Sequence, residues 1–144
     1  MTGDFARAAE IYAENLADAR RRGDDVFVSV ETLNLGYMKL HLGEAAAARP
    51  LFEESLRLSR GAGDAYVVPY SLMGMGSLAL AEGDAERGTR LLAAAKAAFD
   101  AGGFAIDPGS DEEFEQGLRD LADFPGSKPM CRAISGAFVN CTSR

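Results

Sequence analysis

A 40-residue repeat constrains the fold of this 144-residue chain more than any other feature of its sequence. A glycine followed by an acidic residue recurs with this spacing in two series: Gly3-Asp4, Gly43-Glu44 and Gly83-Asp84 form one, and Gly23-Asp24 and Gly63-Asp64 form the other. Apolar positions between these pairs agree in the same register, as at Ile11, Leu51 and Leu91. Self-similarity at a fixed period of about 20–50 residues is typical of stacked repeat architectures.

Each period is predicted to contain two helices separated by a glycine–acid turn. One pair spans roughly residues 24–42 and 44–60, and in the second helix apolar side chains recur at the spacing of an amphipathic helix. An acidic side chain at a helix start can accept hydrogen bonds from free backbone N–H groups. The glycine before it suits the left-handed conformation that ends the preceding helix. The sequence therefore predicts an all-α fold.

Two further glycines, Gly36 and Gly76, lie inside predicted helices and are also 40 residues apart. Glycine within a helix costs about 1 kcal/mol relative to alanine. The simplest explanation is a close approach to the next helix, where a side chain would hold the pair apart.

These residues resemble the tetratricopeptide repeat (TPR). The matching positions are Gly36, Gly43-Glu44, Ala48, Phe52 and Ser55, and then Gly76, Gly83-Asp84, Gly88, Leu92 and Ala95. The period here is 40 residues rather than the usual TPR period of about 34. This longer form is similar to the C-terminal TPR region of large ATP-binding bacterial transcriptional regulators of the LuxR family and antibiotic-regulator type.

The resemblance implies a right-handed TPR-like helical solenoid of antiparallel helix pairs with a C-terminal capping helix. It implies about two and a half repeats over residues 1–104 and a linker and capping helix over 105–123. Beyond these, the breaker-rich stretch at residues 124–129 predicts an irregular or disordered tail over 124–144. The repeat pattern begins with a second helix that lacks its first, and it stops after Asp123. We therefore expect a truncated piece of a longer regulator.

Composition excludes several functional classes. The net charge of −7 makes the chain a poor candidate for direct binding to nucleic acid or to an anionic membrane. No apolar run approaches the roughly 18 residues that a membrane span needs. The N-terminal residues are polar and helix-forming and do not resemble a secretory signal, so we expect a cytoplasmic protein.

Little in the sequence could carry enzymatic chemistry. His41 is the single histidine, and no serine or cysteine has a recognisable base placed for it. Ser110 and Glu113 fit a capping box better than a calcium loop. Cys131 and Cys141 are expected to be reduced thiols without a role. The expectation is a non-enzyme without cofactor or metal.

The remaining candidate is a surface for protein contact. By resemblance, the first helix of each pair lines a concave groove that holds a protein or peptide partner. The predicted groove residues are Val30, Leu33, Tyr37, Leu40, His41, Tyr70, Met73, Ser77 and Leu80. Aromatic and methionine side chains commonly anchor interfaces, although several of these residues could instead form the core between helices.

Two alternative functions remain open at this point. One is a small-molecule effector module, which would need a polar cluster deep in a pocket. The other is a self-association element, because the uncovered N-terminal helix invites a second copy and could form a homo-oligomer.

Overall fold

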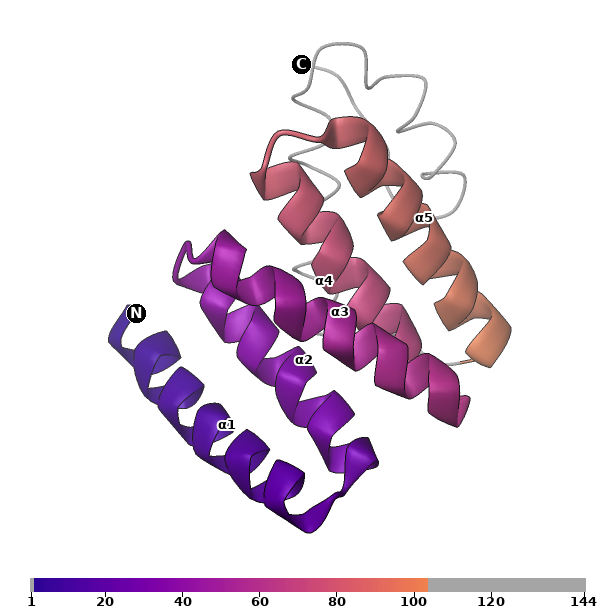
Figure 1. Ribbon diagram of the computed structural model, residues 1–144. Coiled ribbons are helices and arrows are strands. Elements are labelled where there is room, and N and C mark those ends of the chain that lie inside the picture. The colour runs from indigo at the N-terminus through magenta and orange to yellow at the C-terminus, as the bar shows by residue number, and fades with distance from the viewer. Residues whose placement is uncertain (1, 104–144) are drawn as a thin grey trace.

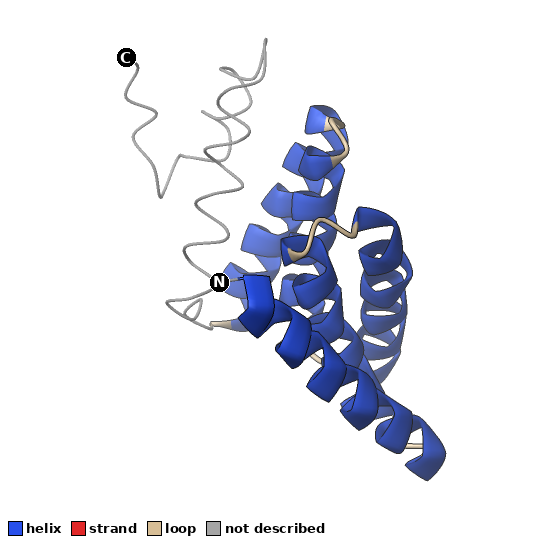
Figure 2. Cartoon of the chain, turned by 90° about the vertical axis from the view of Figure 1, so that its left-hand side faces the viewer, coloured by secondary structure: helices blue, strands red, loops and turns tan. Residues whose placement is uncertain are grey.

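The computed structural model describes residues 2–103 of the chain, and within this range all regular structure is helical (Figure 1). The five helices are α1 (Thr2–Arg22), α2 (Asp25–His41), α3 (Ala45–Ala62), α4 (Val67–Ala81) and α5 (Ala85–Gly102). Successive helices run in opposite directions and are joined by short loops (Figures 1 and 2). The predicted all-α class and the two helices per period are confirmed. The expected capping helix, the tail and both cysteines lie outside the described residues.

The glycine–acid turns form as the sequence predicts. Every described residue with a positive φ is the glycine of such a turn or its continuation: Gly23, Gly43, Gly63, Gly83 and Gly103, with φ between 66° and 82°. Asp24 accepts a hydrogen bond from the backbone N–H of Phe27 at 3.1 Å, and Asp84 accepts one from Arg87 at 3.0 Å. These contacts cap the first turns of α2 and α5.

The turn before α3 differs from the others. Glu44 makes no side-chain capping bond, and its carboxylate instead pairs with Lys39 of α2 at 2.7 Å. Glutamate has one more methylene group than aspartate, and this pair directs its carboxylate to a charged neighbour rather than to the backbone. The acidic residue of the repeat therefore caps the helix backbone at Asp24 and Asp84, and forms an ion pair at Glu44.

The larger core cluster joins α2, α3, α4 and α5, and the Phe52 ring is fully buried within it. A Cβ atom built on Gly36 of α2 would lie 2.8 Å from this ring, and one on Gly74 of α4 would lie 2.4 Å from it. Gly76 shows the same relation to Leu92, at 2.9 Å. The prediction that Gly36 and Gly76 mark close helix contacts is confirmed.

A smaller core cluster holds α1 against α2. Its buried members are Ala9, Leu16, Ala19, Val28 and Leu35, and Leu51 and Leu58 of α3 pack on its edge. An ion pair between Arg20 and Glu54, at 2.6 Å, adds a direct link from α1 to α3. At this partly exposed site the ion pair contributes little free energy, so apolar packing is the main interaction that fixes α1.

We predict that Gly74→Ala and Gly61→Ala change stability in opposite directions. At Gly74 the added methyl group collides with the Phe52 ring, and overpacking of this kind costs about 1–3 kcal/mol. At Gly61 a Cβ meets nothing within 4 Å, so alanine gains helix propensity of up to about 1 kcal/mol. Urea denaturation followed by circular dichroism measures both changes. Equal shifts for the two variants would contradict the role assigned to Gly74.

Candidate interaction surface

Four of the predicted groove residues lie in the core. Leu33, Tyr70 and Met73 belong to the larger core cluster, and Met73 has no exposed surface. This corrects the expectation that they line an open groove, and Leu80 is buried in the same cluster. The reason is that α4 contacts α2, α3 and α5, so few of its side chains face outward.

The half-buried groove residues mostly hold helices together. The Tyr37 hydroxyl donates a hydrogen bond to the backbone carbonyl of Tyr70 at 2.9 Å, and its ring meets Phe52 edge-on at 5.1 Å. Val30 and Leu40 pack against the same core cluster. Tyr37 therefore joins α2 to α4 as well as presenting part of its side chain at the surface. Ser77 is also half-buried.

His41 is exposed, but it lies against the first helix. Its ring stacks on Phe5 of α1 with a centroid distance of 4.5 Å and an interplanar angle of 11°. Its place in the last turn of α2 also suits a basic side chain. The structure thus brings His41 together with α1, and it brings Leu33, Tyr70 and Met73 together inside the core.

The exposed apolar residues are ones that the sequence reasoning missed. The large ones are Ile11, Val26, Phe27 and Tyr66, each about half exposed. Val26 and Tyr66 are 40 residues apart, so they occupy the same position of successive periods at the start of α2 and just before α4. A large apolar residue that recurs beside the acidic residues of a helix start is the sequence pattern that indicates this exposed position.

Each of the two aromatic side chains at these helix starts, Phe27 and Tyr66, contacts a neighbouring side chain. The guanidinium of Arg22 lies 5.4 Å from the centre of the Phe27 ring, a cation–π distance. The Tyr66 ring lies 5.1 Å from that of buried Tyr70. Each ring therefore has a neighbour within the protein and is about half exposed.

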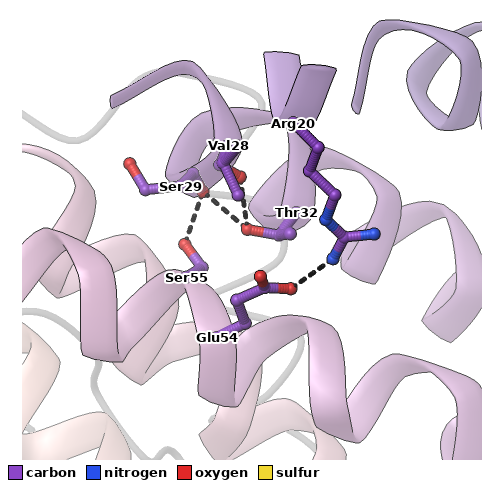
Figure 3. A network of polar contacts seen from close by, with 6 residues as sticks. All are labelled: Arg20, Val28, Ser29, Thr32, Glu54 and Ser55. Atoms are coloured by element: carbon purple, nitrogen blue, oxygen red, sulfur yellow. Dashed lines mark hydrogen bonds and ion pairs between the residues drawn. The ribbon is translucent and has the colours of Figure 1, made fainter. Parts of the chain in front are cut away.

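Buried hydroxyl groups form a seam between α2, α3 and α4. Ser55 donates to the carbonyl of Ser29 at 2.7 Å and lies 2.9 Å from the Ser71 hydroxyl. Thr32 donates to the carbonyl of Val28 at 2.7 Å, and Figure 3 shows this contact beside the Arg20–Glu54 ion pair. Each of these hydroxyl groups has a partner within the protein, so the seam is structural.

Two properties of the described residues concern metal binding and membrane spanning. Residues 2–103 contain no group of three or more histidine, cysteine, aspartate or glutamate side chains that could hold a metal ion. Over the same range, no helix combines the length and apolar character that crossing a membrane requires. The hydrogen bond and charge of Glu82 raise the pKa of Arg49, and this ion pair ties α3 to the turn after α4.

In comparisons with known proteins, no protein-family model and no curated protein matches this chain.

We predict that Tyr70→Ala lowers the stability of the protein much more than Tyr66→Ala does, because Tyr70 is buried and Tyr66 is half exposed. Removing the buried Tyr70 ring leaves a cavity beside Phe99, so the variant loses about 3–5 kcal/mol of stability. Tyr66 is 47% exposed, so its removal costs less than about 1 kcal/mol. Thermal and urea denaturation measure both. A Tyr70→Ala variant as stable as the parent protein would restore Tyr70 to the surface groove.

Proposed function

We propose that this chain is a non-enzymatic scaffold for protein–protein interactions, built as a right-handed TPR-like solenoid. Three properties support the proposal: the 40-residue sequence period, one pair of antiparallel helices per period, and glycines where neighbouring helices approach most closely. The resemblance of the repeats supports a second part, an origin in the sensing or oligomerisation arm of a LuxR-family or antibiotic-regulator-type bacterial regulator. A cytoplasmic location belongs to the same proposal.

The observation that carries the proposal is the exposed apolar surface at the helix starts. Val26 and Phe27 are 57% and 51% exposed, and Tyr66 occupies the position of Val26 one period later. Large apolar and aromatic side chains of this kind are the usual anchors of protein interfaces. The net charge of −7 favours a protein or peptide partner over nucleic acid.

The two alternative functions differ in their support. The effector-module alternative required a polar pocket, but the buried hydroxyl groups of Ser29, Ser55 and Ser71 bond to one another and to the backbone. Self-association has one observation in its favour, the half-exposed Ile11 on α1. It is therefore the second candidate.

We predict that the double variant Phe27→Ser with Tyr66→Ser loses partner binding while it keeps its fold. The tagged full chain captures partners from a lysate of the source organism, and quantitative mass spectrometry compares the parent with the variant. Both side chains are about half exposed, so circular dichroism and the thermal midpoint should change little.

A second double variant, Ala46→Ser with Ala94→Ser, provides the matched control, since both alanines are exposed on other helices. It should retain the same partners as the parent. Identical capture by all three proteins, or the absence of any specific partner, would refute the role of this surface.

A further inference from the structure

The junction between α1 and α2 can be compared position by position with the junction between α3 and α4, one period later. Two contacts join the middle of α3 to α4. The Phe52 ring packs against Gly74, where a Cβ atom would lie 2.4 Å from it. The Ser55 hydroxyl lies 2.9 Å from that of Ser71. If both junctions were packed alike, the same contacts would recur 40 residues earlier.

Neither contact is repeated between α1 and α2. The ring and the glycine of the later junction are matched by Tyr12 and Asn34, and Asn34 carries the side chain that Gly74 lacks. The hydroxyl pair is matched by Asn15 and Glu31, and the Glu31 Oε2 atom has no hydrogen-bond partner. The α1–α2 junction therefore lacks both of the contacts that join α3 to α4.

The Glu31 carboxylate makes the closed packing of α1 on α2 less stable. Glu31 is 9% exposed and shares a stripe of α2 with Val28 and Leu35, which pack against α1 in the smaller core cluster. A carboxylate oxygen that loses water without gaining a donor costs free energy. Movement of α1 away from α2 would return this oxygen to water and remove the cost.

The apolar packing that opposes this movement is modest. The buried residues that α1 contributes to the smaller core cluster are Ala9, Leu16 and Ala19. Alanine buries little apolar area, so Leu16 is the one large side chain among them. Within residues 2–103, the larger core cluster joins α2 to α5 and includes no residue of α1. Figure 1 shows α1 beside α2 and apart from α4 and α5.

The two ends of the junction are connected in different ways. At one end the chain itself joins the helices through the turn at Gly23, and the partly exposed ion pair of Arg20 with Glu54 adds little free energy nearby. At the other end the Phe5 ring stacks on exposed His41, with a centroid distance of 4.5 Å. The Phe5 end is therefore the end that is free to separate when the stack breaks.

We propose that the α1–α2 junction is a joint of the scaffold, at which α1 moves about the Gly23 turn while α2 to α5 remain one packed body. The closed arrangement buries the smaller core cluster, and the open one hydrates Glu31. The angle between α1 and the other helices thereby changes without unfolding of the larger core. The inference goes beyond the proposed function, because it concerns the free protein and not the surface formed by Phe27 and Tyr66.

The test is native-state hydrogen exchange of the full chain, followed by mass spectrometry of peptic fragments. An isolated helix of this length is only marginally stable, so amides of α1 exchange when it leaves α2. We expect protection of residues 9–19 to be at least about tenfold lower than that of α4, and similar along this range. Equal protection of α1 and α4 would overturn the proposal. So would protection that rises steadily along α1, since that indicates fraying of its first turns.

A double variant that supplies the missing hydroxyl pair tests the physical cause. Asn15→Ser with Glu31→Ser introduces the residues of the next period and should raise the protection of α1 about tenfold, as removal of an unpaired buried polar atom allows. Protection of α4 should not change. The matched control, Asn15→Ser with Glu53→Ser, removes the same charge from an exposed site and should leave α1 as in the parent. Unchanged or lower protection of α1 in the first variant would overturn the proposal.

Phe5→Ala provides an independent readout at the moving end. Loss of the stack on His41 should lower the protection of α1 severalfold and leave that of α4 unchanged. An equal loss in both helices would show that they open together and would overturn the proposal. Partner capture that depends on Phe27 and Tyr66 would survive each of these failures, so the two proposals are separable.

Discussion

The packing of the Phe52 ring between two glycines is the contact on which the central helices depend. The ring has no exposed surface, and it occupies the space that side chains at Gly36 and Gly74 would otherwise take. It thereby sets how closely α3 approaches α2 on one side and α4 on the other. Tyr37 completes the site, because its ring packs edge-on against Phe52 and its hydroxyl bonds to the backbone of α4.

The same solution recurs with different residues in the next period, which explains why the helix arrangement was predictable. Leu92 takes the place of Phe52 against Gly76, and the contact is again too close for a Cβ atom. Turn glycines, capping aspartates and close-contact glycines each act on residues a few positions away or one helix away. Such local requirements leave a visible mark in the sequence at a constant spacing, so the helices and their order could be read from it.

The surface could not be read in the same way, because helix spacing does not reveal which flanks are covered. The α4 helix contains no charged residue, and ten of its 15 residues are buried, so no polar face distinguishes its groove side from its core side. For this reason Tyr70 and Met73 were predicted to anchor a partner in the groove, whereas both belong to the larger core cluster. His41 lies on Phe5 through a contact between distant segments that no local pattern indicates. Tyr66 and Val26 occupy the same position of successive periods, and both are about half exposed. Neither residue taken alone indicates this exposure.

Glu31 and Ser71 occupy the same position of successive periods, but one is a glutamate and the other a serine. The repeat therefore keeps its helix packing while the polar group at this position changes. Ser55 and Ser71 both donate and accept, so they satisfy one another and the backbone inside the chain. At the position of Ser71 in the preceding period, the Oε2 atom of Glu31 is buried and has no hydrogen-bond partner. The same repeat position therefore makes a hydroxyl contact at Ser71 and leaves a carboxylate oxygen without a hydrogen bond at Glu31.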